Sequence, residues 1–129
     1  MKKTKVVVMC GSSRFVDIMA VCAWIIEREE KAITMGLHLL PWWYGAEPDH
    51  LAEAEGVAEA MDELHQRKID IADEIFVINH DNYIGESTAN EIAYAKKEGK
   101  NIRYYMDDIM QDEVTRRIHD AIALSKERG

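Results

Sequence analysis

The sequence predicts a three-layer α/β fold, in which helices cover both faces of a doubly wound parallel sheet of four to five strands. Short apolar, β-branched runs alternate with longer amphipathic segments along the whole chain. This alternation is typical of parallel strands joined by crossover helices. The apolar runs are nearly continuous, which indicates strands that are buried on both faces. We expect one domain over residues 1–129, since the chain is short and has no linker, repeat or low-complexity stretch.

The first half of the chain predicts two strands and one helix. The continuous β-branched run at residues 5–10 (KVVVMC) is the first strand. A helix is expected over residues 16–36, with Gly36 at the position just past its end. A second strand is expected at residues 37–42, where Pro41 stops it. The apolar residues that recur at helical spacing in the first helix are Ile18, Val21, Cys22 and Ile25.

The second half predicts strands at residues 74–79 and 101–106 and helices at residues 57–72, 87–98 and 111–129. Apolar spacing defines one inward face on each of two helices. The residues expected on the inward face of the helix at 57–72 are Val57, Met61, Leu64 and Ile71, with Lys68 as a charged exception. Those expected on the inward face of the last helix are Val114, Ile118, Ile122 and Leu124.

The predicted order of elements matches a flavodoxin-like or Rossmann-like sheet. In such sheets, ligands bind beyond the carboxyl ends of the strands. Two loops are therefore the candidate binding loops: residues 11–15 (GSSRF) after the first strand and residues 80–88 (HDNYIGEST) after the third.

Composition narrows the classes of partner and compartment. The formal net charge of −8 argues against a nucleic acid polymer as ligand, because binding its phosphates needs clustered Lys and Arg. A small anion could still bind in a local positive pocket. Cys10 and Cys22 have no metal-ligand spacing and are predicted to be reduced core thiols. No apolar run approaches the roughly 18 residues of a membrane span, and the first run is too short for a signal peptide. We expect a cytoplasmic protein with no membrane partner, no metal ion and no other cofactor.

The first candidate loop carries groups that suit an anionic ligand. Gly11 lets the backbone approach a ligand closely, and Ser12 and Ser13 offer hydroxyl groups. Arg14 adds a forked donor for phosphate or carboxylate, and the next helix presents free N–H groups. The alternative is a simple strand-to-helix turn with a serine N-cap. The loop matches neither the Walker motif nor GxGxxG.

The second candidate loop leads to a glutamate that allows two interpretations. Gly85 permits a tight turn, and Ser87 or Thr88 can cap the following helix. Thr88 and Glu91 have capping-box spacing, which makes Glu91 a capping residue. Alternatively, Glu91 is an ionised carboxylate in the first helical turn, suited to attack the anomeric carbon of a sugar. Glu86 is either an acceptor for a sugar hydroxyl or a solvated loop charge.

Further candidates surround the two loops. Tyr83 and the aromatic cluster at residues 42–44, which includes Trp43, could stack on a base, although at least Trp42 could instead plug the core. Asp81 could accept a hydrogen bond from a sugar hydroxyl or hold Glu91 in place.

Three segments resemble the nucleoside 2-deoxyribosyltransferase superfamily, including its deoxynucleoside 5′-monophosphate N-glycosidase branch. Residues 10–15 (CGSSRF) are similar to the Cys-Gly-Ser-x-Arg start of that branch, and residues 72–79 (ADEIFVIN) to its Ala-Asp strand entry. Residues 87–100 (STANEIAYAKKEGK) are similar to the family's Gly-Thr-x-x-Glu-x-Gly-x-Ala-x-x-x-Gly-Lys. The resemblance spans roughly residues 5–105. It implies an enzyme that cleaves the N-glycosidic bond of a (deoxy)nucleoside or its 5′-monophosphate, and a homodimer or larger homo-oligomer.

The resemblance also implies roles for individual residues. Glu91 matches the family's glutamate nucleophile, which passes the sugar to water or to another base. The positions that match contacts to the nucleotide are Gly11, Ser13, Arg14, Ser87 and Thr88. Ser87 replaces the family's usual Gly, and His65 stands where the family often has an acidic residue. His65 could act as an acid or as a phosphate partner, or could simply lie on the surface of its helix.

Two alternatives remain beside this hypothesis. One is a non-catalytic nucleotide-binding or sensing module on the same fold, because a fold does not imply a reaction. The other is a phosphoribohydrolase of the cytokinin-activating type, which ranks lower since its Pro-Gly-Gly loop is absent. Asp73 opens the third predicted strand at its amino end, away from the candidate loops, which favours a structural role.

Overall fold

The computed structural model describes residues 3–36 and 55–128 and confirms the predicted α/β class. Four parallel strands form one sheet in the order β2-β1-β3-β4. The strands are β1 (Val6–Gly11), β2 (Ile33–Gly36), β3 (Glu74–Ile78) and β4 (Asn101–Tyr104).

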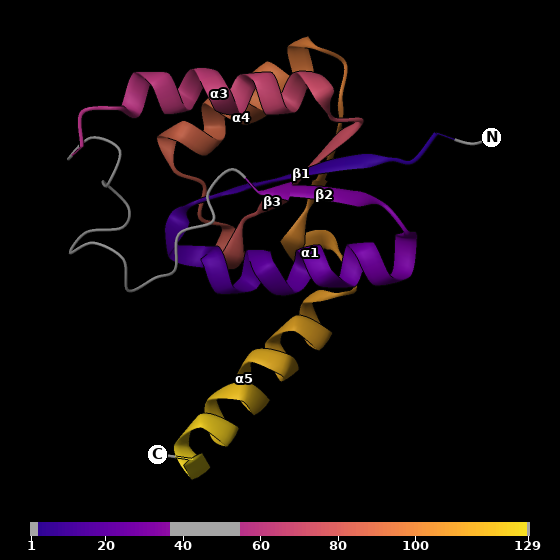
Figure 1. Ribbon diagram of the computed structural model, residues 1–129, viewed down its shortest axis with the longest axis vertical. Helices are drawn as coiled ribbons and strands as arrows, with labels where there is room; N and C mark the ends of the chain where they lie inside the picture. Colours follow the sequence, from indigo (N-terminus) through magenta and orange to yellow (C-terminus); the bar gives the residue numbers. More distant parts are fainter. Residues whose placement is uncertain (1–2, 37–54, 129) are drawn as a thin grey trace.

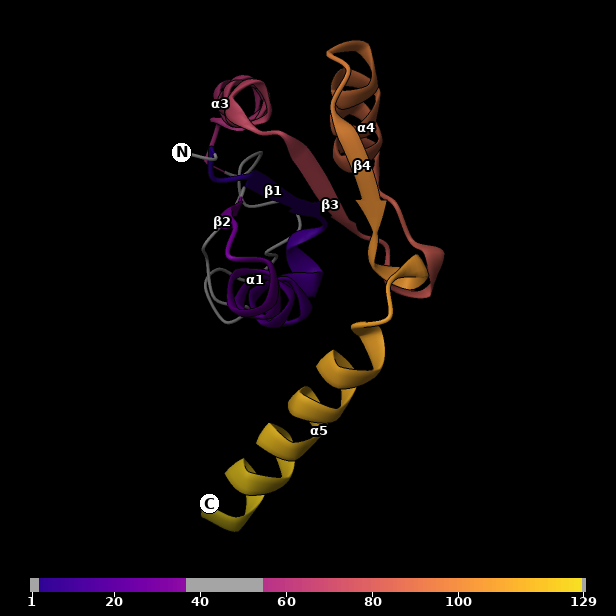
Figure 2. The same cartoon turned by 90° about the vertical axis from the view of Figure 1, so that its right-hand side faces the viewer.

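Helices cover both faces of this sheet, as Figures 1 and 2 show. Helix α1 (Val16–Glu30) packs on one face, and α3 (Ala58–Ile71) and α4 (Glu86–Lys97) pack together on the other. Helix α5 (Gln111–Arg128) begins against α1 and then runs away from the sheet (Figure 2). Short 3-10 turns follow three of the strands: η1 (Ser13–Phe15), η3 (His80–Asn82) and η4 (Tyr105–Asp107).

The strand order places a switch point between β1 and β3. The chain leaves β1 towards β2 on one side and leaves β3 towards β4 on the other. In register, Gly11 at the end of β1 lies beside Ile78 at the end of β3. The two candidate loops therefore emerge next to each other, at the position where open α/β sheets bind ligands.

Each face of the sheet carries its own apolar cluster. Side chains alternate between the faces along a strand, so successive residues of β1 join different clusters. The α1 side contains Val7, Met9, Met19, Cys22, Ile25, Ile26, Ala32, Phe76, Ile78, Tyr105, Met110 and Val114. The α3 and α4 side contains Val8, Cys10, Ile69, Ala72, Ile75, Val77, Ile92 and Ala95. Both cysteines are buried and unpaired, as predicted.

The first helix is shorter than predicted. It ends at Glu30, because Lys31 takes a left-handed conformation with φ of 54°. Strand β2 then occupies the stretch that we expected to be the last helical turn, so the prediction that Gly36 terminates the helix is wrong. The first two residues of β2 are β-branched and favour an extended backbone. The strand predicted at residues 37–42 lies outside the described residues.

The face of α3 that meets the sheet also differs from the prediction. Its buried residues are His65 and Ile69, whereas Val57, Leu64 and Ile71 are exposed. The expected face was chosen by apolar character alone. The helix is instead rotated so that Ile69 joins the α3 and α4 cluster.

Helix α5 buries only its first half. Val114 is fully buried and Ile118 packs against the α1-side cluster, as predicted. Ile122 and Leu124 are exposed, which contradicts the expected inward face. The reason is visible in Figure 2, where the second half of α5 has left the body of the protein.

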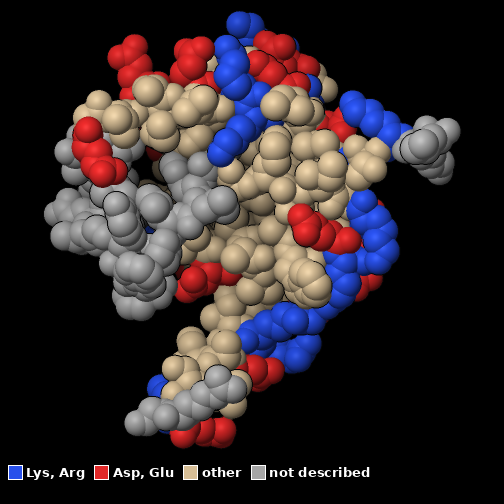
Figure 3. All heavy atoms as spheres, viewed as in Figure 1, with Lys and Arg blue, Asp and Glu red and all other residues tan. Residues whose placement is uncertain are grey.

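Acidic and basic side chains are interspersed across the described part of the face in Figure 3. Acidic side chains gather over α3, and basic side chains lie among them. This face therefore presents mixed charge rather than a continuous basic strip.

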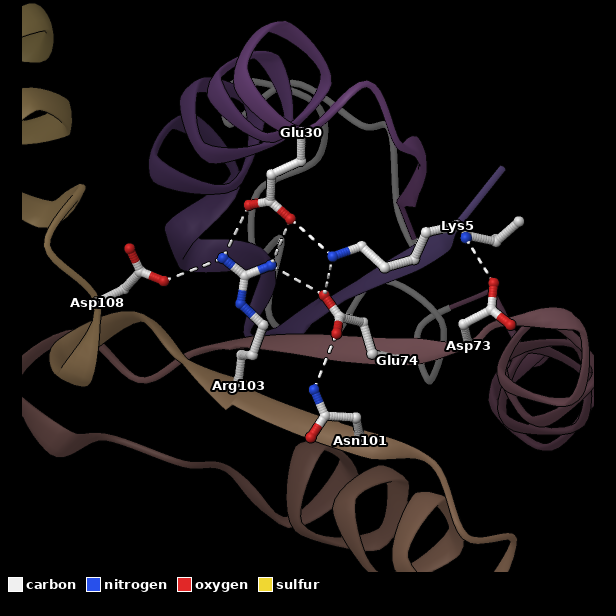
Figure 4. A network of polar contacts seen from close by, with 8 residues as sticks. Lys5, Glu30, Asp73, Glu74, Asn101, Arg103 and Asp108 are labelled. Atoms are coloured by element: carbon white, nitrogen blue, oxygen red, sulfur yellow. Dashed lines mark hydrogen bonds and ion pairs between the residues drawn. The ribbon is translucent and has the colours of Figure 1, made fainter. Parts of the chain in front are cut away.

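A network of ion pairs joins the amino ends of the strands to α1 (Figure 4). Arg103 of β4 donates hydrogen bonds to Glu30 at 3.0 Å, to Glu74 at 2.9 Å and to Asp108 at 3.1 Å. Lys5 lies 2.8 Å from Glu30 and 3.2 Å from Glu74. Glu30 is the last residue of α1. It ties α1 to β4.

Candidate functional site

Gly11 is required by the close approach of β1 to β3. Its φ is +151°, and a Cβ there would lie 3.0 Å from Cβ of Ile78 and 3.2 Å from its carbonyl oxygen. The close backbone approach that we predicted for a ligand is thus made to the neighbouring strand. Ser12 follows as the N-cap of η1, since its Oγ accepts a hydrogen bond from the Arg14 N–H at 3.3 Å.

Aromatic and cationic side chains join the two loops. The guanidinium carbon of Arg14 lies 4.3 Å from the centre of the Tyr83 ring. The Phe15 ring makes edge-to-face contacts with the rings of Tyr83 and His80, at centroid distances of 6.0 Å and 5.6 Å. Gly85 lies beneath Tyr83, because a Cβ added to it would sit 3.4 Å from the Tyr83 hydroxyl.

The start of the second loop bends through an unusual backbone. Asp81 and Asn82 both have positive φ, of 53° and 64°. The side chain of Asp81 is 85% exposed and lies 3.5 Å from Nε2 of His80. This position does not support the hypothesis that Asp81 holds Glu91. Asn79 is buried and fixes the base of the loop, because its Oδ1 accepts a hydrogen bond from the Met106 N–H.

Helix α4 begins earlier than predicted. Its first residue is Glu86 and its N-cap is Gly85, which supplies no side-chain cap. Ser87 and Thr88 are therefore not the N-cap, and Glu91 lies in the second turn rather than the first. The capping-box interpretation of Glu91 is wrong, because the third helical position is Thr88. Glu86 and Ser87 are exposed, while Thr88 is buried.

Glu91 points into the protein, on the side of α4 that faces the sheet. It is 8% exposed, and its Oε1 lies 3.4 Å from Nδ1 of His65 on α3. His65 is 4% exposed, so the interpretation of a surface histidine is wrong. Within the described residues, Oε2 of Glu91 is buried and has no hydrogen-bond partner. One oxygen of this buried carboxylate is thus without a hydrogen-bond partner among the described residues.

Cys10 completes the surroundings of Glu91. Burial raises the pKa of the Cys10 thiol well above its usual range, and the charge of Glu91 and a hydrogen bond to it raise it further. The thiol therefore stays neutral beside the carboxylate. Sequence reasoning placed Cys10 in the core and did not connect it with Glu91, because that contact depends on how α4 packs on β1.

Lys68 was missed by the sequence analysis. Its Nζ donates a hydrogen bond to the carbonyl of Gly36 at 3.0 Å, at the end of β2. Lys68 follows His65 by three residues, so both lie on one face of α3. That spacing was readable in the sequence, but Lys68 was treated as an exception on an apolar face.

Two other aspartates of this region, Asp73 and Asp70, have partners other than Glu91. Asp73 has the structural role that we predicted, since its Oδ2 accepts a hydrogen bond from the Val6 N–H at 2.8 Å. Asp70 pairs with Arg67 and accepts a hydrogen bond from Tyr94 at the surface of α3 and α4. Trp43 lies outside the described residues.

The fold and this site define a Rossmann-like α/β protein with a buried carboxylate near its switch point. Comparisons of the chain with protein-family models, curated proteins and solved structures gave no match. None of the helices within residues 3–36 and 55–128 is long and apolar enough to cross a membrane. In the same residues, no three His, Cys, Asp or Glu side chains are grouped so that they could hold a metal ion.

Proposed function

We propose that this protein cleaves the N-glycosidic bond of a (deoxy)nucleoside or its 5′-monophosphate, with Glu91 as the nucleophile. The proposal agrees with the resemblance to the nucleoside 2-deoxyribosyltransferase superfamily. The observation that carries it is the position of Glu91. Its carboxylate faces the sheet near the switch point, and its buried Oε2 has no hydrogen-bond partner in the described part of the chain.

The chemistry requires a carboxylate oxygen that can reach C1′ of the sugar. Glu91 forms a bond to C1′ while the bond from C1′ to the base nitrogen breaks, and that electron pair leaves with the base. The base takes up a proton, and water or a second base then attacks C1′ and releases Glu91. The transition state resembles an oxocarbenium ion, so the negative charge of Glu91 stabilises it.

A 5′-phosphate has two candidate partners in the described loops. Arg14 is exposed on the first loop and offers a forked guanidinium. The N–H groups at the start of α4 have no side-chain cap, because the N-cap is Gly85. Such N–H groups and the helix dipole favour an anion. These groups would act at short range and so offset the net charge of −8.

A non-catalytic nucleotide-binding module is the second candidate. The contact between Glu91 and His65 favours this second candidate, because the contact also connects α4 with α3. On this alternative, Glu91 stabilises the helix packing and the loops bind a nucleotide without cleaving it.

The test is release of free base from a panel of nucleosides, deoxynucleosides and their 5′-monophosphates, followed by chromatography. Glu91→Gln keeps the size of the side chain and should lower the rate of release by about a thousandfold or more, as expected for loss of a nucleophile. The matched control is Glu98→Gln, which changes an exposed glutamate at the end of the same helix. Full activity of folded Glu91→Gln would refute the nucleophile, and nucleotide binding without any release by the unaltered protein would favour the binding module.

A further inference from the structure

We infer that His65 is a positioning residue for Glu91: it holds Oε1 and leaves Oε2 as the oxygen that reacts. This inference rests on the proposed function. It goes further by assigning different tasks to the two oxygens of one carboxylate.

The geometry places two buried polar groups from different helices against each other. Nδ1 of His65 on α3 lies 3.4 Å from Oε1 of Glu91 on α4, which is an ion-pairing distance without the geometry of a hydrogen bond, and each side chain is more than nine-tenths buried. Burying a polar group costs free energy unless the group interacts with a partner. The packing of α3 on α4 brings these two groups together, so each offsets part of the cost of burying the other. The other oxygen, Oε2, is equally buried and accepts no hydrogen bond from the described residues.

A fixed carboxylate suits a nucleophile better than a mobile one. Glutamate has three rotatable side-chain bonds, and a nucleophile gains rate when its reacting atom is already held in line with the bond that it attacks. Contact with His65 at Oε1 restricts the rotation of the carboxylate plane. At this distance a protonated imidazole attracts the negative Oε1.

The other side chain that contacts this carboxylate is a weaker partner than a protonated His65. Cys10 of β1 approaches Glu91 as a neutral thiol, which is a weak donor. Lys68 lies one turn further along α3, and its Nζ donates to the carbonyl of Gly36. His65 lies within ion-pairing distance of Glu91, at 3.4 Å.

The kinetic test compares His65→Asn with His65→Leu. The amide nitrogen of Asn can occupy the place of Nδ1 and donate to Glu91, whereas Leu has a similar volume and no donor. We expect His65→Leu to lower kcat for base release by about 10- to 100-fold with KM changed less than about threefold. His65→Asn should recover most of kcat. Equal kcat in His65→Leu and the unaltered protein, or equal losses in both variants, would overturn the inference.

A second measurement does not depend on activity. Urea unfolding of His65→Leu, Glu91→Gln and the double variant forms a double-mutant cycle, in which coupled groups give non-additive changes. Additive changes would overturn the contact itself. If the unaltered protein releases base but the changes in unfolding free energy are additive, the proposed function is retained and this inference is rejected. No base release despite non-additive changes would refute the proposed function and the catalytic role of the pair, while confirming the contact.

Discussion

The guanidinium of Arg14 stacks on the ring of Tyr83, with 4.3 Å between its central carbon and the ring centre. The two residues belong to the loops that follow β1 and β3, so the stack bridges the switch point. An exposed cation–π contact contributes only about 0.5–1 kcal/mol. A phosphate group can therefore compete with Tyr83 for the orientation of Arg14, since hydrogen bonds to charged groups are worth about 1.5–3 kcal/mol.

Arg14→Ala should weaken the binding of 5′-monophosphates by about 10- to 100-fold and the binding of nucleosides by much less. The physical reason is that only the monophosphate offers an anion to the guanidinium. Titration calorimetry with matched pairs of nucleoside and nucleotide measures the difference. Arg116→Ala, which removes an exposed arginine of α5, is the control. Equal weakening of both ligand types would count against a phosphate contact.

The ion-pair network predicts a loss of stability in acid. Burial alone would raise the pKa of the Glu74 carboxyl, but hydrogen bonds from Arg103, Asn101 and Lys5 outweigh it and hold the pKa below its ordinary value of 4.5. The pKa of Glu30 is lowered in the same way, against burial, by Arg103 and Lys5. Because the folded values lie below the unfolded ones, this stabilisation is fully present above about pH 4.5 and is lost as the pH falls through the folded values.

Glu74→Gln should therefore flatten the acid limb of the stability profile. We expect the variant to lose about 1–3 kcal/mol in the free energy of unfolding at pH 7, since Arg103 loses one charged partner. Between about pH 5 and pH 3, the unaltered protein should lose stability more steeply than the variant. Urea unfolding at several pH values measures both slopes, with the exposed Glu59→Gln on α3 as control. Parallel slopes for the unaltered protein and Glu74→Gln would show that this network does not govern acid unfolding.

The order of strands and helices could be predicted because it depends on local hydrophobic patterns. The contacts between residues of different helices could not be predicted from these patterns. Contact between His65 and Glu91 requires the rotation of α3 about its axis, which Ile69 fixes by packing on the sheet. Arg103 and Glu30 are separated by 73 residues, and only the assembled sheet brings them together.

The first helix shows a different limit. Its apolar spacing continues past its true end, so periodicity alone extended it to Gly36. The end depends on Lys31, which takes a left-handed conformation that is uncommon for residues other than glycine. Pairing with β1 then holds the following residues as strand β2, and this long-range pairing overrides the local helical pattern.

Both thiols should be unreactive in the folded protein. Cys10 and Cys22 are completely buried, and burial raises the pKa of Cys22 to about 12, with a further contribution from the charge of Asp108. Since the thiolate is the reactive form, neither residue offers a nucleophile at pH 8. Titration with 5,5′-dithiobis(2-nitrobenzoate) should detect both thiols in urea and very slow modification without it. Fast modification of the native protein would mean that the sheet opens readily around β1 or α1.

The turn after β1 provides the last prediction, because Gly11 combines an unusual φ with a lack of space. Gly11→Ala adds a methyl group 3.0 Å from Cβ of Ile78, at a φ of +151°, and we expect it to cost about 1–3 kcal/mol in the free energy of unfolding. Gly56→Ala is the matched control, since Gly56 also has positive φ, of +73°, but has open space around it. Urea unfolding of both variants separates backbone strain from steric crowding. A larger loss of unfolding free energy for Gly11→Ala than for Gly56→Ala would support a tight junction of β1 and β3 beneath the two loops. Equal losses for the two variants would mean that the added methyl group is accommodated against β3 without cost.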